Sequence, residues 1–128
     1  MTSQYAMIMA LGFGLLAYLI GSISPSILLA KSKGVDIKKE GSGNAGTTNT
    51  LRVLGPKAAA ITLVIDVCKG YLAVFIGAYF TADAGVFVMN QTTYLCAVGV
   101  VLGHIWPIFF KFKGGKGIAT AFGAILAV

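Results

Sequence analysis

Long apolar stretches alternate with short polar segments along the chain, and four such stretches stand out. They cover Tyr5–Ala30, with a polar break at 21–26, and then Ala58–Phe80, Thr92–Phe110 and Gly117–Val128. As helices, the second and third would extend about 35 and 28 Å, close to the roughly 30 Å thickness of a bilayer core. The pattern predicts an all-α bundle of transmembrane helices with about four spans.

The first stretch lies where a cleaved signal peptide would be found. A signal peptide begins with a positively charged segment, whereas no Lys or Arg precedes Lys31 in this chain. We therefore expect the first stretch to be a retained helix.

The fourth stretch is short for a membrane span. As a helix it would reach about 18 Å, and about 20 residues are needed to cross the bilayer. We expect the natural protein to continue beyond Val128. The chain would then be the N-terminal part of one larger integral membrane domain.

Lysine and arginine are unevenly divided among the segments that connect the stretches. The segment Lys31–Lys57 carries six of them and Lys111–Lys116 carries three, whereas residues 1–4 and 81–91 carry none. Short loops rich in Lys and Arg stay on the cytoplasmic side of a membrane. We therefore expect both basic segments in the cytoplasm and the N-terminus outside.

The composition favours a membrane protein over a soluble one. Apolar residues make up 57% of the 128 residues and charged residues 11%, against roughly 25% charged residues in a typical soluble domain. A soluble chain of this length could not bury so much apolar surface, and a disordered chain would be more polar. In this setting the net charge of +6 favours membrane lipids or a phosphorylated substrate as partners, and not nucleic acid.

The first cytoplasmic segment concentrates groups that suit phosphate. Glycines let backbone N–H groups approach an anion, hydroxyls and amides donate hydrogen bonds, and arginine offers a planar pair of donors. The members are three glycines (Gly41, Gly43, Gly46), four hydroxyls (Ser42, Thr47, Thr48, Thr50), two amides (Asn44, Asn49) and Arg52. A short helix over Thr47–Leu54 would add the positive end of its dipole. The alternative interpretation is a flexible polar linker.

The same segment also matches the G-x-G-x-x-G pattern of dinucleotide-binding folds, with Asp66 at the distance expected for the ribose ligand. That pattern requires an apolar strand before Gly41, and a charged segment, 36–40, stands there instead. Asp66 itself lies inside a membrane-length apolar run. We therefore reject a dinucleotide site.

The second basic segment has a compact glycine-rich sequence. Gly114, Gly115 and Gly117 flank Lys116, and an apolar helix is predicted to begin directly after them. A helix N-terminus of this kind binds phosphate. The segment is not an ATP-binding P-loop, because Gly117 stands where Ser or Thr would follow the lysine. The alternative is a basic anchor that contacts lipid phosphates.

Two opposite charges lie inside the second apolar stretch. Asp66 and Lys69 are three residues apart and therefore share one face of the predicted helix. Ionisable residues within a span are candidate functional sites, and each alone costs about 3 kcal/mol to insert. The pair is either the midplane site of a transporter or a neutralised structural pair that joins helices.

The single histidine and the two cysteines carry weaker signals. His104 precedes Pro107 near the cytoplasmic end of the third stretch, where it is either a site residue or a hydrogen-bonding group at a helix end. Cys68 and Cys96 lie in apolar runs, and we expect both to be small buried hydrophobes. Since His, Cys and carboxylate residues show no metal-ligand spacing, we expect neither a metal nor another cofactor.

Taken together, the motifs resemble those of the bacterial membrane acyl-phosphate:glycerol-3-phosphate acyltransferases. The resemblance rests on four segments in order: residues 41–52, 66–70, 103–107 and 112–120. It implies a seven-helix enzyme of the bacterial cytoplasmic membrane whose active-site loops face the cytoplasm. Such an enzyme moves a fatty acyl group from acyl phosphate to the 1-hydroxyl of glycerol 3-phosphate, giving lysophosphatidic acid and phosphate.

The resemblance also implies roles for individual residues. The catalytic Ser and Arg of the family's first motif fall on Ser42 and Arg52, and its glycerol-3-phosphate-binding loop falls on Gly114–Gly117 with Lys116. The family's third motif, with Asn, His and Glu in a later loop, has no counterpart in this chain.

The residues themselves fit this chemistry. An acyl phosphate is already activated, so positioning and charge stabilisation can supply the rate without a covalent nucleophile. Arg52 and Lys116 would clamp phosphates and Ser42 would orient a reactant. The leaving phosphate would take the hydroxyl proton, with His104 as the second candidate for that role. The alternative is a small transporter for a phosphorylated anion, but polar groups gather at the cytoplasmic rim of this chain and not at mid-membrane.

The charge distribution makes the topology testable. Cysteines placed at Ser32 and Lys113 should resist an impermeant thiol reagent in intact cells, and a cysteine at Ala82 should react, because the basic segments are expected in the cytoplasm and residues 81–91 outside. Gel-shift labelling before and after cell lysis measures this. Reaction of the first two in sealed cells would reverse the orientation.

Overall fold

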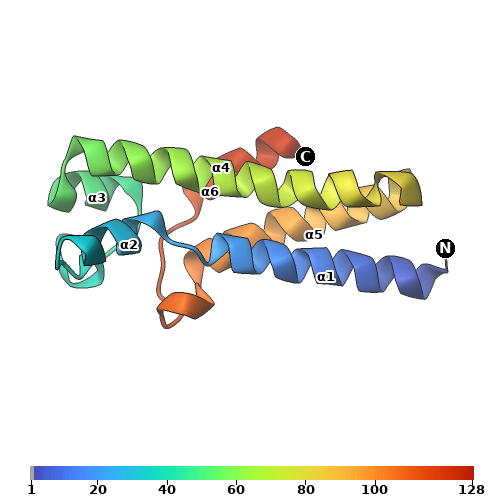
Figure 1. The fold of residues 1–128 in the computed structure, drawn as a ribbon, viewed down its shortest axis with the longest axis horizontal. Helices are drawn as coiled ribbons and strands as arrows, with labels where there is room; N and C mark the ends of the chain where they lie inside the picture. The colour runs from blue at the N-terminus through green and yellow to red at the C-terminus, as the bar shows by residue number, and fades with distance from the viewer. Residues whose placement is uncertain (1) are drawn as a thin grey trace.

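The computed structural model describes residues 2–128, and these residues fold into a bundle of α-helices joined by short turns. The helices are α1 (Ser3–Gly21), α2 (Pro25–Ser32), α3 (Thr47–Leu54), α4 (Pro56–Thr81), α5 (Val86–Ile105) and α6 (Ile118–Ala127), with 3-10 turns η1 (Ile37–Lys39), η2 (Ala82–Ala84) and η3 (Ile108–Phe110). In Figure 1, α1, α4 and α5 run lengthwise, while α2 and α3 gather at the end opposite the N-terminus. The predicted all-α fold is confirmed.

Three helical segments are long and apolar enough to cross a membrane: Ser3–Ser32, Pro56–Ala84 and Val86–Phe110. They contain the first three predicted stretches. The fourth segment, α6, has 10 residues and rises about 15 Å. Within residues 2–128 the structure therefore has three helices of crossing length, and the number of spans stays a prediction. The side on which the N-terminus lies stays a prediction.

The third long helix differs from its predicted limits at both ends. It begins at Val86, before the predicted Thr92, because Gly85 adopts a positive φ of 101° and closes the turn from α4. Polar residues 90 and 91 therefore lie inside the helix. It ends at Ile105, because Pro107 follows and proline cannot continue a helix.

The first predicted stretch is broken where the sequence indicated. Helix α1 ends at Gly21, and α2 begins at Pro25, a position at which the missing N–H of proline costs nothing. Ser24 caps α2, and its hydroxyl accepts a hydrogen bond from the Ile27 N–H at 3.4 Å. The break leaves backbone carbonyls without helical partners inside the bundle.

The bundle has an apolar exterior and polar groups inside it. Large apolar side chains along α1, α4 and α5 are exposed, whereas several threonines are fully buried. The buried Thr81 and Thr92 hydroxyls donate to the carbonyls of Gly77 and Val88, at 2.7 and 2.8 Å. These two hydroxyls are thus paired within their own helices, which suits a bundle surrounded by lipid.

The two cysteines fall on opposite sides of this division. Cys96 is buried in the core, as predicted, whereas Cys68 is exposed on α4. The prediction for Cys68 was wrong because an apolar run in a membrane protein turns part of its surface to lipid instead of a core.

Glycines bring α1 and α5 into backbone contact. A Cβ atom added at Gly21 would collide with the carbonyl oxygen of Val100, and one at Gly103 would collide with that of Tyr18. Small residues at helix crossings allow this approach in membrane bundles. The position of α5 against α1 is therefore fixed by the absence of side chains at the crossing.

Helices α4 and α6 cross in the same way. A Cβ at Gly70 would meet the Thr120 carbonyl oxygen, and one at Gly123 would meet the Val67 carbonyl oxygen. The contact is reciprocal and holds the start of α6 against the middle of α4. It brings Thr120 close to the charged residues of α4.

A Gly103→Ala substitution should lower the stability of the bundle by about 1–3 kcal/mol, the usual cost of overpacking a tight contact. Thermal unfolding of the purified protein in detergent measures the effect. Gly12→Ala in α1 is the matched control, because a Cβ there meets open space and alanine favours a helix by up to about 1 kcal/mol over glycine. Equal melting temperatures for the two variants would contradict the proposed crossing.

Candidate active site

One side chain, Asn49, shapes the first glycine-rich loop. Its Oδ1 accepts a hydrogen bond from the Ser42 N–H at 3.0 Å, and its Nδ2 donates to the carbonyls of Asn44 and Glu40 at 3.0 and 3.1 Å. Asn49 is 2% exposed, so its amide is engaged almost entirely by the loop. In the structure this residue, predicted to bind substrate, clamps the loop to the first turn of α3.

The backbone conformation of this loop requires glycine at two positions. Gly41 and Gly43 have φ values of 54° and 74°, which side-chain-bearing residues rarely adopt. A Cβ at Gly41 would collide with Asn49, and the Gly43 N–H already donates to Glu40 at 2.9 Å. These two predicted phosphate-binding glycines therefore act in the fold of the loop.

Helix α3 has the bounds predicted from the sequence, Thr47–Leu54. Its N-cap is Gly46, which has no side chain to cap the helix, so the first N–H groups are free of a capping side chain. The Thr47 hydroxyl is buried and has no hydrogen-bond partner within residues 2–128. Arg52 lies in the last turn of the same helix. A helix start without a capping side chain and a guanidinium thus belong to the same short helix.

The second glycine-rich loop folds back on the end of α5. The N–H groups of Gly114 and Gly115 donate to the carbonyls of Ile105 and His104 at 3.0 and 3.2 Å. A Cβ at Gly115 would lie 2.6 Å from His104 Nε2. These two glycines let the loop pack on the histidine, and their N–H groups are used there. Gly117, with φ of 83°, then turns the chain into α6.

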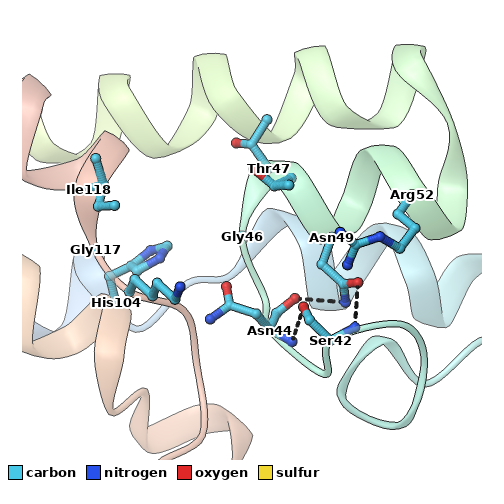
Figure 2. Close-up of a pocket in the computed structure, with 11 residues that line it drawn as sticks. Ser42, Asn44, Gly46, Thr47, Asn49, Arg52, His104, Gly117 and Ile118 are labelled. Atoms are coloured by element: carbon cyan, nitrogen blue, oxygen red, sulfur yellow. Dashed lines mark hydrogen bonds between the residues drawn. The ribbon is translucent and has the colours of Figure 1, made fainter.

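Between the two loops lies a cavity of about 570 Å³, shown in Figure 2. It is lined by Ser42, Asn44, Gly46, Thr47, Thr48, Asn49, Arg52, His104, Lys116, Gly117 and Ile118. We call it the two-loop pocket. Two of its side chains are cations, Arg52 and Lys116, and the lining includes no Asp or Glu of residues 2–128. The pocket is therefore electropositive.

The pocket gathers most of the predicted site residues. Those that line it are Ser42, Asn44, Thr48, Asn49, Arg52, His104, Lys116 and Gly117, and those outside its lining are Gly41, Gly43, Gly114, Gly115, Asp66 and Lys69. Figure 2 shows His104 and Gly117 on one side of the space and Ser42 and Asn44 on the other. Gly46 and Thr47, which belong to the phosphate-suited first segment, also line the pocket, as does Ile118, for which the sequence indicated no role.

A buried charged network lies beside the pocket. Lys69 Nζ is 2.9 Å from Asp66 Oδ1 and also donates to the carbonyls of Gly21 and Ile23, at 3.1 and 2.8 Å. The ammonium group of Lys69 thus has one carboxylate as its ion-pair partner and two backbone carbonyls as hydrogen-bond acceptors. Asp66 and Lys69 are 1% and 5% exposed. These contacts join α4 to the break between α1 and α2, an arrangement that fits the structural interpretation of the pair better than a transport site.

The same network reaches the pocket through His104. Its Nδ1 lies 3.5 Å from Asp66 Oδ1 and 3.2 Å from the Thr120 hydroxyl, and the residue is 5% exposed. Nothing in the sequence indicated that His104 and Thr120 adjoin the ion pair. These residues lie on three helices, and only helix packing brings them together. The one signal available in the sequence was that His104 and Thr120 are polar residues, each at a predicted helix end that is rich in glycine.

The fold and the pocket define a class of protein: a helical integral membrane protein with an electropositive, phosphate-suited pocket at one end of the bundle. Residues 11–128 match the family model described as glycerol-3-phosphate acyltransferase. The chain belongs to this family.

Relatives and solved structures agree with that assignment. The chain is 46% identical over 126 residues to the glycerol-3-phosphate acyltransferase of Thermoanaerobacter pseudethanolicus, and 50% identical over 113 residues to that of Clostridioides difficile. These alignments cover 98% and 88% of the chain but 58% and 55% of the relatives. The chain therefore spans a little over half their length.

Two crystal structures of PlsY (YgiH), described as an integral membrane glycerol 3-phosphate acyltransferase, have the same arrangement. The glycerol 3-phosphate form superposes with a TM-score of 0.79 and the lysophosphatidic acid form with 0.76, each at 42% identity. The chain aligns over 93% of its own length and over 57% and 56% of those chains.

Removal of one partner of the buried pair should lower the stability of the bundle. Lys69→Met leaves Asp66 charged and unpaired, which typically costs about 3–5 kcal/mol. The double variant Asp66→Leu/Lys69→Met removes both charges and should recover most of that loss. Unfolding in a detergent titration followed by circular dichroism measures both. Wild-type stability of Lys69→Met alone would contradict the structural role.

Proposed function

We propose that the protein containing this chain transfers a fatty acyl group from acyl phosphate to the 1-hydroxyl of glycerol 3-phosphate, with lysophosphatidic acid and phosphate as products. The observation that carries the proposal is the two-loop pocket, in which Arg52 and Lys116 from separate loops border one cavity. Both reactants carry a phosphate, and the pocket offers two cations. Membership of the family supports the same reaction.

The reaction balances without a nucleophile on the protein. The acceptor hydroxyl oxygen attacks the acyl carbonyl carbon, the new C–O ester bond forms, and the bond between that carbon and the phosphate oxygen breaks. The leaving phosphate carries the electron pair and takes the hydroxyl proton. What the protein must supply is alignment of two anions and stabilisation of charge on the leaving phosphate.

Arg52 suits the alignment role. Its guanidinium is planar and always charged, and it can bind two phosphate oxygens at once. Helix α3 places Arg52 on one side of the loop that Asn49 clamps, and Ser42 belongs to that loop. We assign Arg52 to a phosphate clamp and Ser42 to a hydrogen bond that orients a reactant.

The remaining polar groups of the pocket differ in whether their hydrogen-bonding atoms are already engaged by the protein. Lys116 is exposed and supplies a mobile point charge. His104 has its Nδ1 turned toward Asp66 and Thr120, so we place it as the second candidate for the proton, after the leaving phosphate.

The setting of the pocket supports a location at a membrane surface. It lies at the end of the bundle where α2 and α3 gather, opposite the N-terminus (Figure 1). The segments that form it carry nine of the ten Lys and Arg residues of the chain, a bias typical of the cytoplasmic side. We propose the bacterial cytoplasmic membrane, with glycerol 3-phosphate arriving from the cytoplasm and acyl phosphate from the lipid phase.

Arg52→Lys tests the clamp, because it keeps the charge and removes the two-point geometry. We expect turnover of purified protein, with both substrates saturating, to fall by at least about 100-fold. That fall corresponds to roughly 2.7 kcal/mol, the scale of losing one preorganised donor. Release of phosphate from acyl phosphate in the presence of glycerol 3-phosphate gives the rate.

The matched control is Lys57→Arg, which exchanges the same two residue types in reverse at an exposed position outside the pocket. Its turnover should stay within twofold of the wild type. Near-normal turnover of Arg52→Lys would mean that Arg52 serves only as a positive charge that sets topology. The proposed phosphate clamp in the two-loop pocket would then be wrong.

A further inference from the structure

A second cavity, of about 430 Å³, lies at the same end of the bundle and shares no lining residue with the two-loop pocket. It is formed by α2, η1, η3 and the residues beside them. Its lining comprises Ile27, Lys31, Gly34, Val35, Asp36, Ile37, Lys38, Phe109, Phe110 and Lys111. We call it the lysine pocket. The reaction proposed above makes no use of it.

Three lysines from three separate elements converge on this cavity. Lys31 comes from α2, Lys38 from η1 and Lys111 from the turn after η3. Lys38 Nζ donates to the Phe110 carbonyl at 3.0 Å, and Lys31 Nζ lies 5.1 Å from the centre of the Phe110 ring. Lys111 is held in a left-handed conformation with φ of 57°, which is uncommon for a residue with a side chain. The fold therefore gathers like charges around one aromatic residue.

The single carboxylate of the pocket does not neutralise these lysines. Asp36 uses its Oδ1 to accept the Lys38 backbone N–H at 3.1 Å, as the cap of η1. Within residues 2–128 the ion pairs of the chain involve Asp66 alone, so Asp36 pairs with none of the three ammonium groups. Three cations and one anion leave a net charge of +2 on the lining, and gathered like charges attract an anion.

The surroundings of the lysine pocket are those of a membrane interface. Its floor is apolar, because Ile27, Ile37 and Phe110 belong to one buried cluster. Beside it, Phe109 and Phe112 are 59% and 55% exposed. Aromatic residues next to lysines are typical of the headgroup level of a bilayer. A small soluble anion would make no use of an apolar floor and an exposed aromatic rim, whereas an amphiphile would use both.

We propose that the lysine pocket binds the phosphate-bearing headgroup of an anionic glycerophospholipid, with the phosphate between the three ammonium groups and the glycerol and upper acyl chain over the apolar floor. The cavity volume falls within the range of small-molecule sites, roughly 300–1,000 Å³. The site is separate from the acyl-transfer pocket and does not depend on the reaction assigned there. It gives the protein a bound lipid at its cytoplasmic rim.

The test measures lipid binding directly. Purified protein in a neutral detergent is titrated with phosphatidic acid, and in parallel with phosphatidylcholine, and native mass spectrometry gives the fraction carrying one lipid. The double variant Lys31→Gln/Lys111→Gln removes two of the pocket charges. We expect its affinity for phosphatidic acid to fall at least tenfold, because each lysine near a membrane surface contributes measurably to binding of anionic lipid.

The matched control is Lys33→Gln/Lys113→Gln, which removes the same charge from exposed positions in the same two segments but outside the lining. Its affinity for phosphatidic acid should stay within twofold of the wild type. Equal losses in both variants would overturn the proposal in favour of general attraction to anionic lipid. Equal wild-type affinity for phosphatidylcholine would also overturn it, because the lysines would then confer no selectivity.

A third arm separates a lipid headgroup from free phosphate. Inorganic phosphate at 100 times the lipid concentration should leave phosphatidic acid bound, because phosphate lacks the apolar part that contacts the floor. Displacement by inorganic phosphate at that ratio would assign the pocket to a soluble anion. Since no arm measures acyl transfer, failure here leaves the proposed reaction intact, and failure of the reaction leaves this site intact.

Discussion

The ion pair between Asp66 and Lys69 is the interaction on which the arrangement of the helices depends. An ammonium group inside a bilayer must be neutralised and hydrogen-bonded, and here it finds its acceptors in the carbonyls of Gly21 and Ile23. Those carbonyls are available because α1 stops there. The free carbonyls at the break after α1 and the ammonium group of Lys69 on α4 therefore satisfy each other's hydrogen bonds. Either alone would leave buried polar groups without these partners.

This arrangement links the interior of the bundle to its reactive end. Asp66 contacts His104, which closes one side of the two-loop pocket, and Thr120 joins them from the first turns of α6. Glycines at the helix crossings allow α5 and α6 to come near enough for these contacts. The polar groups that carry out the proposed chemistry thus rest on a polar network inside the membrane-embedded part.

Much of the fold could be predicted from local patterns. The length of the apolar stretches predicted the three long helices, the polar break at residues 21–26 marked the end of α1, and the bounds of α3 follow from a glycine before it and another after it. Spacing alone placed Asp66 and Lys69 on one face. The start of α5 was missed because polar residues 90 and 91 interrupt the apolar run, although a helix accepts them at its surface.

The candidate site was less accessible to prediction. Composition indicated that both loops suit phosphate, but not that they border one cavity, because that depends on how helices far apart in the sequence pack. The glycines were expected to present N–H groups to a ligand. In the structure Gly41 and Gly43 fold the first loop, and Gly114 and Gly115 pack the second against His104. A glycine motif in the sequence does not tell which of these uses applies.

The clamp formed by Asn49 has a consequence for the energetics of binding. A loop with three glycines has many accessible conformations, and fixing them costs conformational entropy of about 1–2 kcal/mol per residue. Three hydrogen bonds from one buried amide fix the turn around Ser42 and Asn44 as the chain folds. In the proposed reaction the ligand would meet a loop that is already ordered, so its own binding energy would remain available for bringing the two phosphates and the reacting carbon into line.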